Sequence, residues 1–366
     1  MKPRILVLLS NDLVYDQRMS RMAQAWTEQG FAVTLLGRRR RHSSALGAKP
    51  YRQVRLRLLF ESGKLFYIEL NLRLFVYGLL ASYDALCGVD LDTAPAAMAL
   101  KRLNNKPYVY DAHELFPHVP EVSRRPRIQA FWQTVQDRVF RRFDAAYTVG
   151  SAIADYFEKT YHRPVGVVRN APIRVGEPSY QPDTERFVLY QGALNEGRGL
   201  EPLLEAVQHT GSKLVLVGEG DLSASLRKQV ADRELGSQVQ FAGFVRPEDL
   251  PAWTRRAYLG FNVSENLGLS YYLSLNNKFF DYVQAGLPSL INDFPEYQAL
   301  VAEYEVGVLL EAQSNQIAAQ LNRVMNDEAF HAHMHQECLK AAKEWVWARE
   351  SQKLGEIWSQ VLPLPK

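Results

Sequence analysis

Residues 264–288, SENLGLSYYLSLNNKFFDYVQAGLP, stand between two short apolar runs at residues 258–263 and 288–291. An apolar run, a longer helical pattern and a second apolar run predict a strand, a crossover helix and a parallel strand. The same alternation continues along the chain, with further apolar runs at Arg4–Leu9, Ala32–Leu36, Asp84–Cys87, Pro107–Tyr110, Ala145–Val149, Phe187–Tyr190, Lys213–Val217, Gln238–Phe241 and Val306–Leu310. Parallel sheets covered by helices are therefore expected throughout, which is an α/β fold.

The chain has 366 residues, more than one hydrophobic core usually supports, so two domains are expected. The alternation stops after Asn170 and restarts at Phe187. Between them lie residues typical of a linker, namely Pro172, Gly176, Pro178 and Pro182. We expect two doubly wound, Rossmann-like domains at residues 1–172 and 183–343. Residues 344–366 are expected to form a C-terminal helix, rich in tryptophan, that packs back onto a domain surface.

Composition narrows the class of protein. A hydrophobic content of 47% is enough for packed cores, and a formal net charge of +3 gives no reason to expect nucleic acid as a partner. Cys87 and Cys338 are too far apart to suggest a disulfide framework or a zinc site, which fits a reducing compartment. The amino-terminal apolar run is short and has no small-residue cleavage pattern, so we interpret it as a strand and the protein as cytoplasmic.

Residues 264–288 also carry side chains suited to a sugar nucleotide. Glu265 and Asp281 can each accept hydrogen bonds from sugar or ribose hydroxyls. Lys278 and the N–H groups that open a helix at Asn277 can face a diphosphate. These four residues are therefore the first candidates for binding a nucleotide-diphosphate sugar.

Glycine-containing turns follow three of the expected strands in the second half. The turn in YQGALNEGRGL, residues 190–200, contains Gly192 and Arg198, and the later turns contain Glu219 and Phe244. Ligands of open α/β sheets bind at this edge, where a guanidinium can pair with phosphate oxygens in a forked geometry. Alternatively, Arg198 is a solvated loop residue and the glycines only serve the turns. Three such turns in one domain favour a donor-binding edge that includes these four residues.

Five stretches of the chain resemble, in order, the motifs of GT-B glycosyltransferases, and most of all those of the retaining glycosyltransferase family 4. They are YDAHELFP at 110–117, VVRNAP at 167–172, GALNEGRGLEPLLEA at 192–206, LVGEGDL at 216–222 and NKFFDYVQAGLP at 277–288. Each is moderately specific alone, and their order and spacing over nearly the whole chain carry the resemblance. It implies two Rossmann-like domains facing a cleft, the first binding the acceptor and the second the nucleotide sugar.

The resemblance assigns a basic pair after the first strand of the second domain to the diphosphate. Arg198 matches its second member, whereas Ala193 stands at the first. We therefore expect Lys278 to replace the missing cation, because preorganised positive charge stabilises a diphosphate leaving group. The resemblance also implies that no metal is required, and the DxD pattern at residues 90–92 lies outside the expected donor domain.

An acidic pair eight positions apart is typical of the family, the first contacting the donor sugar and the second the ribose. Glu265 matches the first and Asp281 the second, but here they are 16 positions apart. We expect an inserted turn or loop that carries Asn277 and Lys278. The resemblance accordingly assigns Glu265 to catalysis and Asp281 to donor binding.

His113 follows the expected strand PYVYD, within Asp111-Ala112-His113-Glu114. A lone histidine is usually a structural hydrogen-bonding residue. Its match to the family's histidine near the donor sugar implies a catalytic role in sugar positioning or transition-state contact, with retention of anomeric configuration. Asp16 and Arg18, after the first strand, are the candidates for acceptor binding, and helix capping with surface charge is the alternative for them.

Residues 64–82, KLFYIELNLRLFVYGLLAS, are strongly apolar but short for a spanning helix, and they carry charges in the middle. Basic residues precede and follow them, at Arg38–Arg41, Arg52, Arg55, Arg57, Arg124, Arg125 and Arg127. An apolar helix beside a cationic face suits an anionic membrane surface and a peripheral position at the inner face of the membrane. A buried helix of the N-terminal domain with unrelated basic loops explains the same pattern.

Together these features predict a glycosyltransferase that moves a sugar from a nucleotide-diphosphate sugar to a glycan or lipid-linked acceptor, as in polysaccharide biosynthesis. A nucleotide-sugar epimerase of the same architecture is one alternative, since it needs no acceptor. A noncatalytic GT-B-like subunit that binds a partner or a membrane is the other, because Ala193 and the altered acidic spacing depart from the family.

Overall fold

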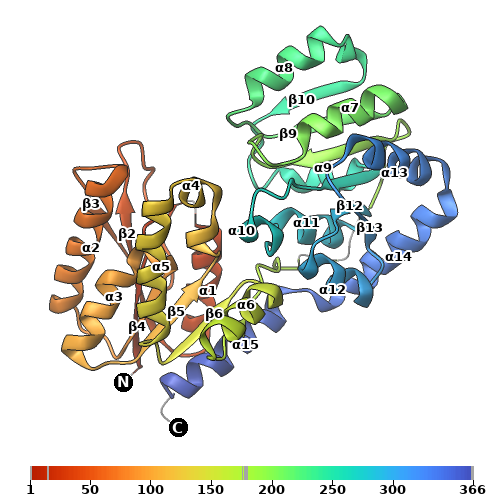
Figure 1. The fold of residues 1–366 in the computed structure, drawn as a ribbon. Helices are drawn as coiled ribbons and strands as arrows, with labels where there is room; N and C mark the ends of the chain where they lie inside the picture. Colours follow the sequence, from red (N-terminus) through yellow and green to blue (C-terminus); the bar gives the residue numbers. More distant parts are fainter. Residues whose placement is uncertain (1, 15, 175, 177–179, 364–366) are drawn as a thin grey trace. The chain divides into compact units, whose positions relative to one another are not determined.

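The computed structural model describes residues 2–14, 16–174, 176 and 180–363 (Figure 1). Pro178 of the expected linker and residues 364–366 of the expected tail helix lie outside the described residues. The chain divides into two compact units: unit 1 comprises Met1–Arg169 and Glu350–Lys366, and unit 2 comprises Asn170–Arg349. The last helix therefore belongs to the unit that the first half of the chain builds.

Unit 1 is built on a seven-stranded sheet whose neighbouring strands all run parallel. Its strands are β1 (Arg4–Leu8), β2 (Ala32–Arg39), β3 (Arg52–Arg57), β4 (Ala85–Val89), β5 (Tyr108–Ala112), β6 (Ala145–Thr148) and β7 (Gly166–Val167). They lie in the order β3-β2-β1-β4-β5-β6-β7. Every position of β4 and β5 is buried, because helices cover both faces of a parallel sheet.

Two groups of helices flank this sheet. The helices of unit 1 are α1 (Gln17–Glu28), α2 (Gly63–Leu80), α3 (Asp90–Asn104), α4 (Pro120–Ser123), α5 (Pro126–Phe140), α6 (Ser151–Tyr161) and α15 (Trp347–Val361), with a 3₁₀ turn at Phe116–His118. Helices α2, α3 and α5 lie side by side (Figure 1). Helices α1 and α15 contact each other through Trp26 and Trp358, whose ring centroids are 5.2 Å apart.

Unit 2 repeats the plan with six parallel strands in the order β10-β9-β8-β11-β12-β13. The strands are β8 (Phe187–Gln191), β9 (Lys213–Val217), β10 (Val239–Gly243), β11 (Leu259–Asn262), β12 (Ser289–Asn292) and β13 (Gly307–Leu310). The helices are α7 (Leu200–Thr210), α8 (Ser223–Asp232), α9 (Leu250–Arg256), α10 (Leu269–Tyr272), α11 (Asn277–Ala285), α12 (Pro295–Glu303), α13 (Ser314–Asn326) and α14 (Glu328–Glu344), with a 3₁₀ turn at Leu235–Ser237. The predicted pair of doubly wound, Rossmann-like folds is therefore confirmed.

Each sheet has a point where the chain reverses its direction of winding. In unit 1 this point lies between β1 and β4, and in unit 2 between β8 and β11. The loops that leave neighbouring strands there diverge to opposite faces, which leaves a ligand crevice at the carboxyl ends of the strands. The loops after these strands are therefore the expected place for the functional residues of each unit.

Every apolar run expected to be a strand forms one, with ends shifted by at most three residues. Strand β3, RQVRLR, was not predicted because arginines interrupt it, and it lies half-exposed at the edge of its sheet. The two-residue strand β7 also escaped prediction. The tail expected as one helix from Glu344 is interrupted, since α14 ends at Glu344 and α15 begins at Trp347.

Helix α15 is held to unit 1 by apolar and polar contacts. The ring of Trp358 is fully buried, with its centroid 5.2 Å from that of Trp26 and 6.3 Å from that of Phe31. The buried carboxylate of Glu350 accepts a hydrogen bond of 2.8 Å from the backbone N–H of Arg169. A tryptophan buried against two rings contributes a large share of a domain's stability.

Replacing Trp358 by alanine is expected to lower the free energy of unfolding of unit 1 by about 3–5 kcal/mol, because the change leaves a cavity beside Trp26 and Phe31. Urea unfolding followed by tryptophan fluorescence and circular dichroism measures it. Gln360→Ala, at an exposed position of the same helix, is the matched control. A loss below about 1 kcal/mol in Trp358→Ala would show that α15 is dispensable for unit 1.

Candidate functional site

In unit 2, Lys278 and Arg198 form a cationic pair at the start of α11. The Lys278 side chain is buried, and its Nζ lies 3.8 Å from the centroid of the Tyr190 ring. Burial, and then the nearby charge of Arg198, lower the pKa of Lys278 well below its ordinary value. Within the described residues the ammonium group has no hydrogen bond or ion pair. A guanidinium and a buried amino group that takes up a proton beside an anion, neither of them paired with a carboxylate, are suited to bind an anion.

Asn276 positions the cationic pair. This residue precedes the first turn of α11, and its Oδ1 accepts a hydrogen bond of 3.3 Å from Nη1 of Arg198. Its Nδ2 donates to Oδ1 of the buried Asn262 at 3.2 Å, and its backbone N–H donates to the Tyr297 hydroxyl at 2.9 Å. The Asn276 side chain makes no capping bond, so the N–H groups at the start of α11 stay available to a bound anion.

The turn after β8 brings backbone close to the end of β9. Gly192 has φ +134° and Gly218 has φ +138°, a region that favours glycine. A Cβ added to Gly218 would lie 1.9 Å from the carbonyl oxygen of Gly192, so no side chain fits between the two turns. Gly192 itself is exposed. The two turns therefore present bare backbone at the edge where the cationic pair lies.

Glu219 and Phe244 lie on the next two turns along this edge. The Glu219 carboxylate is exposed and accepts a hydrogen bond of 2.8 Å from Arg227. Phe244 follows Gly243, and 75% of its surface is exposed. A Cβ added to Gly243 would lie 3.6 Å from Oε1 of Glu219, so the two turns are adjacent. An exposed phenyl ring beside a carboxylate is suited to stack on a flat ring and to accept hydrogen bonds from hydroxyls.

The two predicted carboxylates lie in different settings. Asp281 is exposed on the second turn of α11, where its Oδ2 accepts a hydrogen bond of 3.2 Å from Nε2 of the buried Gln191. Glu265 is half-buried, and its carboxylate accepts from the backbone N–H of Gly199 at the start of α7. Burial, and then the charge of Glu201, raise the pKa of Glu265. Asp281 is thus tied to the end of β8, whereas Glu265 is tied to the start of α7.

An inserted turn or loop between Glu265 and Asp281 was expected to carry Asn277 and Lys278. The segment between Glu265 and Asp281 forms the short helix α10, and Asn277 and Lys278 open α11 itself. Asn277 is exposed, and Lys278 points to Tyr190. Sequence reasoning missed Asn276, although an asparagine directly before a helix is a recognised signal for its start.

In unit 1, Arg18, Asp111, His113 and Asp90 form a charged network. Arg18 and Asp111 are almost fully buried and pair at 3.3 Å, while Arg18 also donates to the carbonyl of Val168 at 3.0 Å. The His113 ring lies between two carboxylates, with Nδ1 3.2 Å from Asp90 and Nε2 3.2 Å from Asp111. Arg18, Asp90 and His113 follow β1, β4 and β5, and Asp111 lies at the carboxyl end of β5, so the network lies at the reversal point of this sheet.

Asp90 is held in an unusual backbone conformation. Its φ is +55°, which is strained for a residue other than glycine. Its Oδ1 accepts a hydrogen bond of 2.8 Å from the backbone N–H of His113, and its Oδ2 faces the ring of the same residue. Such strain persists where function requires it. The DxD pattern thus gave little signal from sequence, yet its first aspartate clamps the predicted catalytic histidine.

The protonation state of His113 follows from these neighbours. Burial disfavours a charged imidazole, but the carboxylates of Asp90 and Asp111 outweigh it and raise the pKa of His113 well above its ordinary value. Both ring nitrogens then donate, one to each aspartate. In the neutral ring, Nε2 instead accepts from Nε of Arg18 at 3.1 Å. At neutral pH His113 is therefore a fixed cation that serves as a hydrogen-bond donor rather than as a base.

Asp16 and Arg18, the predicted acceptor-binding residues, have structural partners. Asp16 caps α1, since its Oδ1 accepts from the backbone N–H of Met19 at 2.9 Å. Arg18 lies within the charged network and only 6% of its side chain is exposed. The structure thus brings Arg18 together with His113. Asp16 lies at the start of α1, the helix that carries Arg18.

The described residues contain no group of three or more His, Cys, Asp or Glu side chains arranged to hold a metal ion. None of the described helices is both long enough and apolar enough to cross a membrane.

Two family profiles together match most of the chain. Residues 17–172 match the profile described as Glycosyltransferase Family 4, and residues 177–345 match the one described as Glycosyl transferases group 1. The predicted resemblance is therefore confirmed from sequence profiles that meet close to the boundary between the two units.

Curated relatives are 25–29% identical to the chain over the residues that align. The GDP-mannose:cellobiosyl-diphosphopolyprenol alpha-mannosyltransferase of Xanthomonas campestris is 25% identical over 332 residues, covering 85% of this chain and 76% of that protein. The O-antigen chain mannosyltransferase C of Escherichia coli is 26% identical over 157 residues, covering 38% of this chain. That match spans only 40% of the Escherichia coli protein.

Solved structures share the fold across nearly the whole chain. Sucrose-phosphate synthase from Thermosynechococcus elongatus superposes with a TM-score of 0.79 at 16% identity, covering 98% of this chain and 99% of that one. Anabaena HepE in complex with UDP-glucose superposes with a TM-score of 0.75 at 16% identity, covering 98% and 99%. At this identity the likeness establishes the architecture of the chain.

Replacing Asp90 by asparagine is expected to lower the pKa of His113 toward its ordinary value, because the change removes one carboxylate and keeps an acceptor for the His113 N–H. The folded-state pKa of His113 lies above its unfolded value. The pairing therefore adds stability that is fully present below the ordinary histidine pKa and is lost as pH rises through the folded pKa. Imidazole NMR titration and pH-dependent urea unfolding measure both effects.

Asp155→Asn, which removes an exposed carboxylate of the same unit, is the control and should change neither quantity. An imidazole that titrates at its ordinary pKa in the wild-type protein would contradict the fixed-cation assignment.

Proposed function

This chain belongs to the glycosyltransferases of the GT-B fold, and we infer that it transfers a sugar from a nucleotide-diphosphate sugar to an acceptor. The observation that carries the proposal is the cationic pair of Arg198 and Lys278 at the amino end of α11. The pair lies at the edge of unit 2 where doubly wound sheets bind nucleotides. A bound diphosphate supplies the negatively charged partner that both side chains lack in the free protein.

The donor contacts follow from the chemistry of the edge. Arg198 and Lys278 pair with diphosphate oxygens, joined by the N–H groups that open α11 at Asn277. Gly192 lets the backbone approach the phosphates without a side chain between them. In this proposal Lys278 supplies the charge that the family places at the position of Ala193.

The other donor residues are assigned by their surroundings. Asp281, held by Gln191, and the exposed Glu219 accept hydrogen bonds from hydroxyls of the ribose. Phe244 stacks against the base. Glu265 is assigned to the donor sugar by family resemblance, and burial keeps its carboxyl group easier to protonate than usual.

The proposed mechanism uses fixed charge. Breaking the sugar–phosphate bond leaves negative charge on the diphosphate, which Arg198 and Lys278 stabilise without moving. Because Arg198 and Lys278 both carry positive charge once the diphosphate is bound, we propose that no divalent metal is required. His113, an imidazolium bound by Asp90 and Asp111, is assigned by family resemblance to sugar positioning or transition-state contact, and the same resemblance implies retention of anomeric configuration.

The substrates of similar proteins support a particular class of donor and acceptor for this chain. The Xanthomonas campestris protein is a mannosyltransferase that uses GDP-mannose and a diphosphopolyprenol-linked acceptor, and the Anabaena structure holds UDP-glucose. We propose a nucleoside-diphosphate hexose as donor and a glycan or lipid-linked saccharide as acceptor, with acceptor binding in unit 1 near Arg18 and Asp16. Synthesis of a surface polysaccharide is the process that such an activity serves.

Purified protein incubated with GDP-, UDP-, ADP- and dTDP-sugars, a diphosphopolyprenol-linked saccharide and a chelator should add one sugar to the acceptor. Mass spectrometry detects the product, and NMR of its anomeric proton reports the configuration. Arg198→Ala should lower the rate by about 100-fold to 1,000-fold, because it removes a preorganised contact to the leaving group. Lys278→Ala should act in the same direction.

Lys228→Ala, at an exposed lysine of α8, is the control and should leave the rate unchanged. An epimerised donor formed without acceptor, or no transfer from any donor, would contradict the proposal. Loss of activity in chelator alone would contradict only its metal-free part.

A further inference from the structure

Exposed apolar side chains are concentrated on one part of unit 1. The described residues include twelve exposed large hydrophobics, and eight of them fall between residues 59 and 80. These eight are Leu59, Phe60, Leu65, Ile68, Leu72, Val76, Leu79 and Leu80, and we call them the α2 patch. A cluster of this kind on a protein surface marks an interaction site.

The α2 patch is a continuous stripe on a well-anchored helix. Its helical members repeat at intervals of three or four residues from Leu65 to Leu79, which places them on one face of α2. The opposite face is buried and includes Gly78, where an added Cβ would lie 2.3 Å from Leu100 of α3. Glu69 accepts hydrogen bonds of 2.8 Å and 3.0 Å from the backbone N–H groups of Leu59 and Phe60. The loop residues are thereby fixed beside the stripe.

A cavity of about 700 Å³ adjoins the carboxyl end of the stripe. It lies at the amino-terminal ends of the first three strands, where β1, β2 and β3 begin at Arg4, Ala32 and Arg52. The proposed donor and histidine sites lie at carboxyl ends of strands, so this cavity is a separate site on unit 1. Leu80, which is 85% exposed, belongs to both the α2 patch and the cavity wall.

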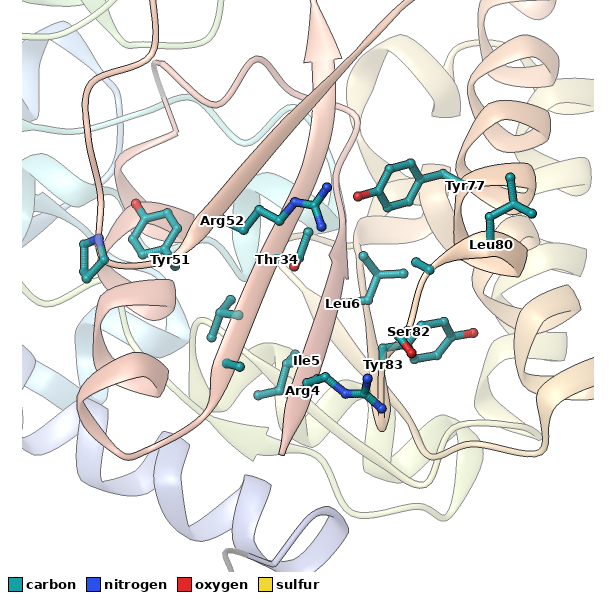
Figure 2. A pocket seen from close by; sticks show the side chains of 14 residues that line it. Arg4, Ile5, Leu6, Thr34, Tyr51, Arg52, Tyr77, Leu80, Ser82 and Tyr83 are labelled. Carbon is teal, nitrogen blue, oxygen red and sulfur yellow. The ribbon is translucent and has the colours of Figure 1, made fainter. Parts of the chain in front are cut away.

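The cavity has an apolar floor and two polar groups that point into it from opposite sides. Figure 2 shows the guanidinium of Arg52, on β3, and the phenol of Tyr77, on α2, directed toward each other above Leu6. Within the described residues neither side chain has a hydrogen bond or ion pair. Arg4, by contrast, is bound to Asp84 through two contacts of 2.9 Å and 3.0 Å. An unpaired guanidinium beside a phenol hydroxyl is suited to bind one phosphate group.

The net charge of residues 49–82 favours an anionic ligand for the α2 patch and the cavity. Residues 49–82 contain six basic and two acidic side chains, a net charge of +4, whereas the whole chain carries +3. Not all of these cations are available, because Arg55, which was expected to join the cationic face, is bound to the buried Asp12 at 3.2 Å. Lys64, Arg52 and Arg57 are exposed. An apolar stripe with cations at both ends complements the acyl chains and phosphates of an anionic membrane.

We propose that unit 1 binds an anionic lipid surface through α2. The α2 patch enters the boundary between headgroups and acyl chains, and Arg52 with Tyr77 receives a lipid phosphate in the adjoining cavity. The binding is reversible and interfacial, with the helix lying in the plane of the membrane. It is independent of glycosyl transfer, because it uses the edge of the sheet opposite the histidine network.

Cosedimentation of the full chain with vesicles tests the proposal. One set contains phosphatidylcholine alone, and the other contains equal parts of phosphatidylcholine and phosphatidylglycerol. The wild-type protein should bind the anionic set more tightly, and added salt should weaken that binding. Ile68→Ser with Leu72→Ser should lower vesicle binding at least about tenfold, since two exposed aliphatic anchors are lost. Arg52→Gln should lower binding about fivefold on anionic vesicles only.

The matched controls are Leu103→Ser, an exposed leucine on α3, and Arg142→Gln, an exposed arginine after α5. Neither should change vesicle binding, and circular dichroism should show all variants folded. Equal binding to both vesicle sets, or none, would overturn the proposal. So would a wild-type dimer that Ile68→Ser with Leu72→Ser converts to monomer, because the patch would then cover a second copy. Thermal stabilisation by glycerol 3-phosphate without vesicle binding would reassign the cavity to a free phosphate.

Discussion

The buried amino group of Lys278, held over the Tyr190 ring beside the guanidinium of Arg198, is the constraint on which the functional edge of unit 2 depends. Removing an ammonium group from water is costly unless an anion compensates it, and the lowered pKa of Lys278 reflects that cost. The neighbouring backbone is arranged around this charge, because Asn276 orients Arg198 and leaves the first N–H groups of α11 uncapped. The edge is thus prepared for a ligand that brings negative charge.

In unit 1, by contrast, the charged side chains are paired with one another. Its network pairs two cations, Arg18 and His113, with two carboxylates, Asp111 and Asp90, so the cluster is neutral as a whole. A neutral network is stable without a ligand and fixes the orientation of the His113 ring. The two units therefore differ: unit 2 has two basic side chains without a carboxylate partner, and unit 1 has a rigidly held imidazolium ring.

Much of the fold could be predicted from sequence, because buried parallel strands are continuous apolar runs bounded by helical patterns. Strand β3 could not, since its arginines serve other purposes: Arg55 pairs with Asp12, and Arg52 lines the cavity beneath α2. The candidate site was predicted in part. Arg198 and Lys278 were identified from motif and spacing, and the structure brings them together.

The partners that hold the site were harder to find. Asp90 and Gln191 lie far in sequence from His113 and Asp281, and only the sheet order makes them neighbours. The backbone strain at Asp90 leaves no mark in a sequence at all. Burial likewise could not be predicted from sequence, since lysine side chains are usually exposed, whereas that of Lys278 is buried and lies over the Tyr190 ring.

Proton-linked binding of a nucleoside diphosphate tests the central claim most directly. Isothermal titration calorimetry with GDP and UDP, in buffers of different ionisation enthalpy, counts the protons taken up on binding. Between the ordinary pKa values of histidine and lysine, the account predicts proton uptake by the wild-type protein, because the diphosphate raises the depressed pKa of Lys278. Lys278→Ala should abolish the uptake and weaken binding about tenfold or more. Tight binding without proton uptake, unchanged in Lys278→Ala, would contradict it.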